Sequence, residues 1–143
     1  MNLTENKVFC DTSFFIASLC PEDSNFEKAG ELLKYCMDNS VTLCTTWDVI
    51  SETATLLRYR GDQKAAVLYL EKIKPFLFIV QCNESVKTAA EEVFMEFPKN
   101  KRLSFCDAIS YIVVTHMLDN MPCLSFDKDF RGLGLTVYPK MEL

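Results

Sequence analysis

The sequence lacks several features that would point to particular protein classes. It has four glycines, five prolines, 49% apolar residues and no long apolar run. This composition argues against a disordered chain and against a transmembrane helix, which needs about 20 consecutive apolar residues. Residues 1–7 also lack the basic start and apolar stretch of a signal peptide. We therefore expect a cytoplasmic protein without membrane contacts, folded as a single domain over residues 1–143.

Histidine and cysteine offer little catalytic chemistry. The seven cysteines are odd in number and none is spaced as Cys-x-x-Cys, so they are predicted to be small buried apolar residues in a reducing compartment. His116 is the only histidine and lies on an apolar segment. We interpret it as a structural residue rather than a general base. Catalysis without either side chain leaves the carboxylates.

Apolar periodicity predicts short strands that alternate with helices. The expected strands are residues 7–10, 41–45, 76–80, 123–126 and 135–138. The expected helices are residues 14–19, 26–37, 46–59, 63–74, 86–97 and 105–118, with a capping box at 24–27 before the second of them. This alternation predicts an α/β fold with a central parallel sheet of about five strands and helices on both faces.

Four acidic residues stand at abrupt ends of apolar segments. Asp11 and Asp127 directly follow expected strands, and ligands of parallel sheets bind beyond the carboxyl ends of the strands. Asp107 begins an apolar helix, whereas Glu52 lies about two turns into its helix, on the side of Leu56. A buried carboxylate is costly unless something pairs with it. If the four acids converge, a metal ion can hold them together.

Each acid also has a purely structural alternative. Asp107 follows Ser104 by three residues, as in a capping box, and suits the dipole at the start of a helix. Glu52 could be a solvated residue on a helix face. Three other acids could be turn residues that leave strands: Asp11, Asp127 and Asp129. The joint pattern of the acids, rather than any single one, favours a functional site.

The order of these segments resembles the PIN-domain ribonucleases, and especially the VapC-type toxins of prokaryotic toxin-antitoxin pairs. The resemblance is carried by residues 8–13, by an acid in the helix after the second strand, and by residues 103–108 and 124–130. It covers nearly the whole chain, although residues 61–100 match only as generic helix and strand. It implies a PIN-like three-layer sandwich, an acidic pocket for Mg²⁺ or Mn²⁺, and endonucleolytic cleavage of RNA.

The resemblance also implies roles for individual positions. Ser13 would support the first acid by a hydrogen bond, and Ser125 would orient the loop that carries the fourth. The implied metal cluster has five acids, the last in an outer position: Asp11, Glu52, Asp107, Asp127 and Asp129.

Contacts to RNA would have to come from local basic residues, because a formal net charge of −5 opposes a broad electrostatic footprint. Such residues are either phosphate contacts or ordinary solvated surface. Two groups are candidates: Arg58, Arg60 and Lys64 after Glu52, and Lys99, Lys101 and Arg102 before Asp107.

Two other functions stay open at this point. A metal-dependent phosphoacceptor domain would use Asp11 as its nucleophile, although residues 11–13 lack the second acid of a dehalogenase-like site. A catalytically silent PIN-like module would act through protein contacts alone. The toxin likeness further implies a small antitoxin that inserts an arginine or lysine among the carboxylates. Helices 26–37 and 63–74 are candidates for its docking groove or for a homodimer seam.

Overall fold

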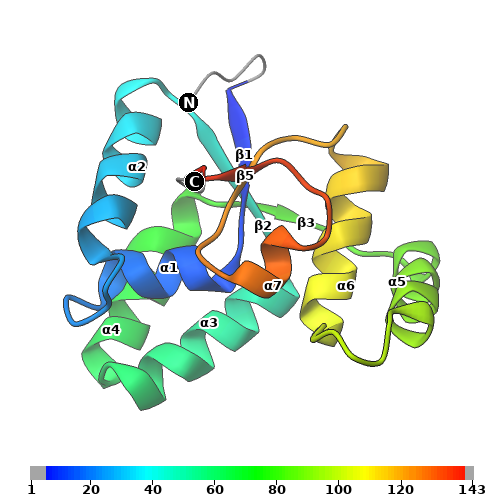
Figure 1. Ribbon diagram of the computed structural model, residues 1–143. Coiled ribbons are helices and arrows are strands. Elements are labelled where there is room, and N and C mark those ends of the chain that lie inside the picture. Colours follow the sequence, from blue (N-terminus) through cyan, green and yellow to red (C-terminus); the bar gives the residue numbers. More distant parts are fainter. Residues whose placement is uncertain (1–5, 141–143) are drawn as a thin grey trace.

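The computed structural model describes residues 6–140, which form a five-stranded, all-parallel sheet between layers of helices (Figure 1). The strand order is β3-β2-β1-β4-β5. The strands are β1 (Lys7–Cys10), β2 (Thr42–Thr46), β3 (Phe78–Val80), β4 (Cys123–Leu124) and β5 (Val137–Tyr138). The predicted α/β fold is therefore confirmed. Residues 1–5 and 141–143, which the expected domain and the signal-peptide argument include, lie outside the described residues.

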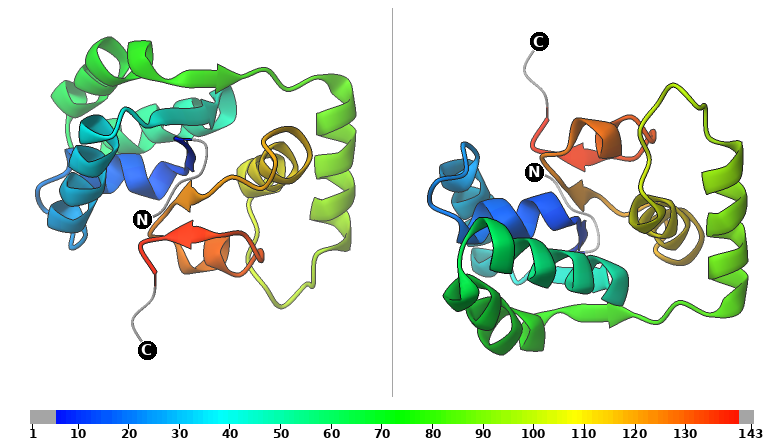
Figure 2. Two further views of the ribbon diagram at one scale, coloured as in Figure 1. Left: turned by 90° about the horizontal axis from the view of Figure 1, so that it is seen from above. Right: turned by 90° about the horizontal axis from the view of Figure 1, so that it is seen from below.

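Figure 2 shows the three layers, with α5 and α6 on one side of the sheet and α1, α2 and α4 on the other. The helices are α1 (Thr12–Leu19), α2 (Phe26–Asp38), α3 (Trp47–Arg60), α4 (Gln63–Leu68), α5 (Glu84–Glu96), α6 (Phe105–Ile112) and α7 (Lys128–Arg131).

The expected helices 63–74 and 105–118 are α-helical only in their first part and end in turns of other helical types. After α4 the chain forms a π-helical turn at Tyr69–Ile73 and a 3₁₀ turn at Lys74–Phe76, which contains Pro75. Proline has no N–H to donate, so the helix ends there. A second π-helical turn, Val113–Met117, follows α6.

The expected strand 123–126 is too long, because the chain turns sharply after β4. The backbone N–H of Ser125 still donates to the carbonyl of Tyr138, but the N–H of Asp127 donates to the Ser125 hydroxyl instead of to a neighbouring strand. This turn leads into α7, a four-residue helix that the periodicity does not predict.

Strand β1 lies at the centre of the sheet and leads directly into Asp11. Val8, Phe9 and Cys10 are fully buried, as expected for a strand that is paired on both sides and covered on both faces. The chain builds β2 and β3 on one side of β1 and β4 and β5 on the other. The carboxyl end of β1 is thus the point where the strand order reverses, which is where open α/β sheets bind ligands.

The cysteines lie largely as expected. Five of the seven cysteines are buried, Cys82 and Cys106 are half-buried, and all are free thiols. His116 is exposed in the turn that follows α6. Within residues 6–140, none of the helices has the length and apolar character that a bilayer crossing requires.

Candidate active site

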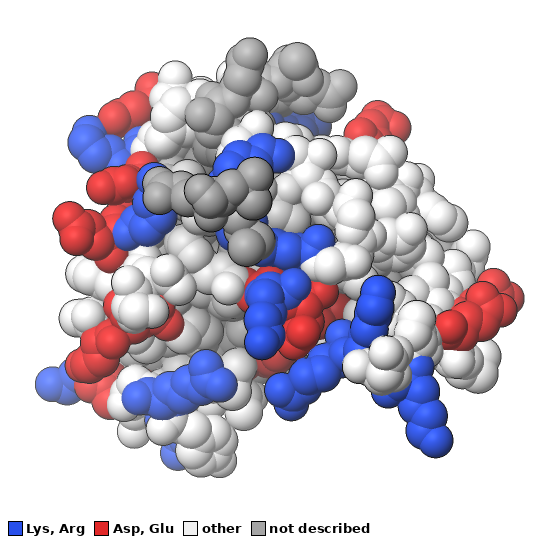
Figure 3. All heavy atoms as spheres, in the orientation of Figure 1, with Lys and Arg blue, Asp and Glu red and all other residues white. Residues whose placement is uncertain are grey.

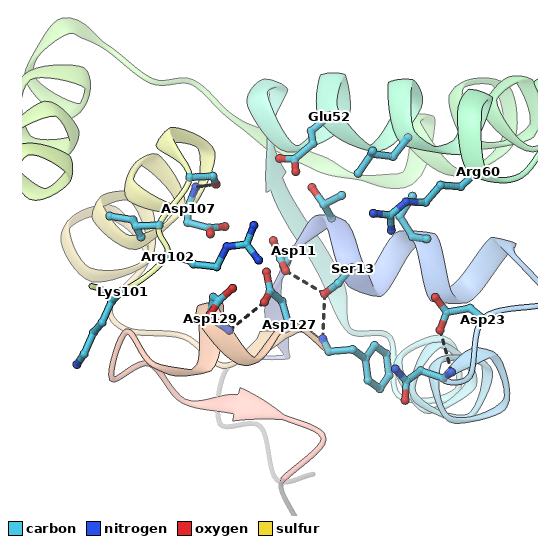
Figure 4. A pocket seen from close by; sticks show the side chains of 17 residues that line it. Asp11, Ser13, Asp23, Glu52, Arg60, Lys101, Arg102, Asp107, Asp127 and Asp129 are labelled. Carbon is cyan, nitrogen blue, oxygen red and sulfur yellow. Dashed lines mark hydrogen bonds between the residues drawn. The ribbon is translucent and has the colours of Figure 1, made fainter. Parts of the chain in front are cut away.

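A cavity of about 820 Å³ opens at the carboxyl edge of the sheet (Figure 4). On the molecular surface, acidic atoms lie recessed near the centre of this face, with lysine and arginine atoms around them (Figure 3). The acids that line the cavity are Asp11, Asp23, Glu52, Asp107, Asp127 and Asp129. The basic residues that line it are Arg60, Lys101 and Arg102.

Asp11 continues β1 and is only 4% exposed. It is the N-cap residue of α1, yet its side chain makes no capping hydrogen bond. Its Oδ2 instead accepts hydrogen bonds from the hydroxyls of Ser13, at 3.0 Å, and Ser125, at 2.8 Å. Burial raises the pKa of Asp11, and these two hydroxyls oppose that rise. A turn therefore does not account for the position of this carboxylate.

The same two serines join the end of β1 to the loop after β4. The hydroxyls of Ser13 and Ser125 lie 3.1 Å apart. Ser13 Oγ accepts from the backbone N–H of Phe126 at 2.9 Å, and Ser125 Oγ accepts from that of Asp127 at 3.1 Å. Ser125 is fully buried behind the cavity. The network fixes Asp11 and the start of α7 relative to each other.

Asp127 and Asp129 belong to the short helix α7. Asp127 is its N-cap residue, and its Oδ1 accepts from the backbone N–H of Asp129 at 2.9 Å. The turn alternative thus holds for Asp127, although its carboxylate also lines the cavity. Arg131 anchors the other end of α7 by donating from Nη2 to the carbonyl of Ser125 at 2.8 Å.

Asp107 lies in the first turn of α6 and is 8% exposed. The N-cap residue is Ser104, whose hydroxyl accepts from the backbone N–H of Asp107 at 3.0 Å. Burial raises the pKa of Asp107 to about 7, with further contributions from the charges of Asp11 and Asp127. Hydrogen bonding with Ser104 opposes this rise. The predicted cap at Ser104 is therefore present, and it places a carboxyl with a raised pKa in the cavity.

Glu52 is half-buried on α3 and faces the cavity together with Leu56, one turn further along. The N-cap of α3 is Thr46, whose hydroxyl accepts from the N–H of Val49. The buried stripe of the helix, which includes Val49, packs inward and leaves Glu52 at its margin. Cys106 adjoins Glu52, and burial together with this carboxylate raises the pKa of its thiol.

Within the described part of the chain, no ion pair balances the charge of these acids. Among residues 6–140, the ion pairs within 4.0 Å join exposed side chains on α2 and α5 and involve none of the cavity acids. In the close-up, the Arg102 side chain extends among Asp11, Asp107 and Asp127, whereas Lys101 points away (Figure 4). The cavity therefore holds a partly desolvated excess of negative charge.

The donor set suits a hard divalent cation. Carboxylate oxygens are the ligands that Mg²⁺ and Mn²⁺ prefer. The hydroxyl of Thr12, beside Asp11, is buried in the cavity wall and has no hydrogen-bond partner among residues 6–140. In this conformation, no three His, Cys, Asp or Glu side chains of residues 6–140 lie close enough to hold one ion together. Shared ligation would therefore require changes of side-chain rotamer.

Only part of the predicted basic set reaches the cavity. Arg58, Lys64 and Lys99 are exposed but do not line it. At 100° per residue, Arg58 lies about 200° around α3 from Arg60, so the two cannot face the same cavity. Lys64 lies on α4, beside a separate shallow hollow.

Sequence reasoning assigned no functional role to several residues of the cavity wall, among them Asp23 and Asn25. The expected capping box at 24–27 is wrong, because the N-cap of α2 is Asn25 and its side chain makes no capping bond. Instead, Asp23 Oδ1 accepts from the backbone N–H of Asn25 at 2.8 Å. Reading Asp23 as an Asx-turn residue would have been the available signal.

The sequence matches the PIN domain family over residues 8–134. Among solved structures, the chain is similar to VapC20 of Mycobacterium tuberculosis, a sarcin-ricin loop cleaving toxin, with a TM-score of 0.78 and 24% identity over 90% of this chain and 96% of that one.

It is also similar to VapBC2 of Rickettsia felis, solved with a DNA fragment from its promoter, with a TM-score of 0.64 and 13% identity. A third similar structure is FitAcB of Neisseria gonorrhoeae, with a TM-score of 0.60 and 11% identity. Each of the last two matches covers 92% of this chain and 96% of the other. A search of curated proteins gave no match. The family match and the shared fold together show that this chain belongs to the PIN domain family.

Proposed function

We propose that this protein is a divalent-metal-dependent endoribonuclease that hydrolyses phosphodiester bonds of RNA in the acidic cavity. The observation that supports this proposal most is the shared cavity of Asp11, Glu52, Asp107 and Asp127, whose charges no ion pair balances within residues 6–140. Membership of the PIN domain family supports the same chemistry.

The four acids would hold Mg²⁺ or Mn²⁺, with Asp129 in an outer position. Two such ions would balance the four carboxylate charges and, when bound, would supply activation of a water molecule and stabilisation of the leaving oxygen in an in-line displacement. Ser13 and Ser125 keep Asp11 oriented through the hydrogen bonds to its Oδ2. Such partners that orient metal ligands typically contribute strongly to metal affinity.

The remaining steps belong to side chains of the cavity. Asp107 or Glu52 would accept the proton that the attacking water loses. Arg102 and Lys101 neutralise and position the phosphates of the substrate, because they are the basic residues that line the cavity on the side of Asp107. A histidine is not needed in this scheme.

A toxin role and a protein partner form the second part of the proposal. One similar structure is a toxin that cleaves the sarcin-ricin loop, and another is a VapBC pair. We infer that a small antitoxin blocks the cavity with an arginine or lysine, and that the protein forms homodimers in the cytoplasm. Exposed apolar side chains on the segment that begins with α4, namely Val67, Leu68 and Leu70, offer one contact surface for either partner.

Cleavage of total RNA, with Mg²⁺ and with a chelator, tests the proposed activity. We expect fragments only with the metal and none from Asp11→Asn. In calorimetry, Asp11→Asn should bind Mg²⁺ at least about tenfold more weakly, since even residues that only orient metal ligands have effects of this size. Asp48→Asn is the matched control, because Asp48 is an exposed acid in the first turn of α3.

Equal metal affinity in wild type and Asp11→Asn would remove Asp11 from the ligand set. Metal binding without RNA cleavage would favour the alternative of a silent binding module.

A further inference from the structure

The cavity continues well beyond the carboxylates proposed to bind metal. In the close-up, Asp23 and Arg60 lie at the opposite end from Asp107, with Ser13 between them (Figure 4). Asn25 lines the same cavity. The proposed hydrolysis assigns no role to Asp23 or Asn25, so this end of the cavity needs its own explanation.

The polar groups at this end are held in place but keep hydrogen-bonding capacity for a ligand. Asp23 Oδ1 accepts from the backbone N–H of Asn25, which leaves Oδ2 available. The Asn25 side chain makes no capping bond, although Asn25 occupies the N-cap position of α2. Within residues 6–140, Arg60 forms no ion pair within 4.0 Å. Both Asp23 and Asn25 are half-buried, so a ligand here would be partly shielded from water.

The mixture of charges excludes a plain phosphate site. A carboxylate repels phosphate, so Asp23 is a poor choice for holding the RNA backbone. A carboxylate does accept N–H groups from the edge of an unstacked base, and an arginine donates to base oxygen and nitrogen atoms. Apolar and aromatic walls for the base are available, because Ile16, Leu56 and Phe126 also line the cavity.

Guanine matches this set of groups better than the other three bases. Its Watson–Crick edge carries two adjacent donors, N1–H and the N2 amino group, and its other edge carries two acceptors, O6 and N7. Asp23 can accept from the donors, Arg60 can donate to the acceptors, and the Asn25 amide can do either. Uracil has a single N–H donor, while adenine and cytosine each present one amino group to such a carboxylate.

We propose that Asp23, Asn25 and Arg60 form a base-binding subsite that takes a guanine of single-stranded RNA near the bond to be cleaved. This inference rests on the proposed ribonuclease function, because it assumes that the RNA backbone runs past the metal-binding acids. It adds a choice of base to a site whose other basic residues contact phosphate.

The test measures base preference by binding, separately from cleavage. Fluorescence anisotropy would follow labelled uridine heptamers with a central guanine, adenine, cytosine or inosine, in chelator and at low salt, where phosphate contacts are strongest. We expect the guanine heptamer to bind about tenfold more tightly than the adenine one, as for one well-placed base contact. Inosine lacks the N2 amino group and should lose part of this advantage.

The diagnostic variant is Asp23→Asn, which keeps an oxygen to accept from the N–H of Asn25. It should make the affinities for the guanine and adenine heptamers nearly equal, while Glu22→Gln should leave the ratio of these affinities unchanged. Glu22 is the matched control because it is exposed, adjacent and outside the cavity wall. If Asp23 merely repels RNA, Asp23→Asn will strengthen binding of every heptamer equally.

Equal binding of all four heptamers by the wild type, or a guanine preference that survives in Asp23→Asn, would overturn the subsite. A guanine preference without metal-dependent cleavage would leave the subsite intact and refute the proposed nuclease. Metal-dependent cleavage without a base preference would support the proposed nuclease and refute the subsite.

Discussion

Asp107 shows how a single residue serves both the fold and the proposed chemistry. It lies in the first turn of α6, where a negative charge suits the helix dipole. Its carboxyl is nevertheless desolvated and lies near the charges of Asp11 and Asp127, which raises its pKa to about 7. Without a cation, the ionised form of this carboxyl is therefore electrostatically unfavourable in the folded protein.

This pKa predicts how stability depends on pH in chelator. The pKa of Asp107 rises from 3.8 to about 7 on folding, so between these values the folded state binds more protons than the unfolded state. Stability then decreases as pH rises from about 4 to about 7. Burial also raises the pKa of Asp11 and adds to the same trend. Melting temperatures measured across this range should fall with pH.

Asp107→Asn should make this pH dependence shallower, whereas Asp48→Asn, in the first turn of α3, should leave it unchanged. A melting temperature that rises with pH in chelator over this range would show that other groups of the folded protein already balance the charges of the cavity acids.

At the scale of elements, residues 97–104, between α5 and α6, bring positive charge to the acidic cavity. Arg102 reaches in among the acids and Lys101 also lines the cavity, whereas Lys99 does not. The loop ends at Ser104, which caps α6. The same short segment thus positions Asp107 and supplies the nearest cations for a phosphate.

Arg102→Ala should weaken RNA binding and make it less dependent on salt. Losing one phosphate contact lowers the logarithmic salt slope by about 0.7 for a single strand. Metal affinity should change little, because arginine is not a ligand. The measurement is RNA affinity at several salt concentrations, with Arg58→Ala as the control, since Arg58 is exposed outside the cavity wall. Equal slopes in wild type and Arg102→Ala would mean that Arg102 is ordinary surface.

The elements also show what the sequence can predict. β1 was predictable because its unbroken apolar run ends in an acid, which fits a central parallel strand. α7 was not, because four residues are too few to show helical periodicity. Asp23 and Asn25 were missed because their segment fits a capping box, and only tertiary structure shows that both face the cavity. The loss of Arg58 from the basic set follows from helix geometry and could have been anticipated.

At the scale of the whole molecule, the formal net charge of −5 opposes binding of RNA. The cavity concentrates six acids, and three basic residues line it. Divalent cations would reverse much of this local charge, so metal and RNA binding should be coupled in the proposed function. The sequence alone predicts the edge of the sheet at which these groups meet, but their distances and burial depend on the packed fold.

The most direct test of the account compares wild type with Asp107→Asn, using RNA cleavage in Mg²⁺ and thermal melts in chelator. Asparagine keeps the shape of the side chain and removes one charge. We predict that Asp107→Asn abolishes metal-dependent cleavage and melts in chelator at the same temperature as wild type or higher. An Asp107→Asn protein that cleaves RNA normally and is slightly less stable would show that Asp107 only stabilises the first turn of α6, and would contradict the proposed nuclease site.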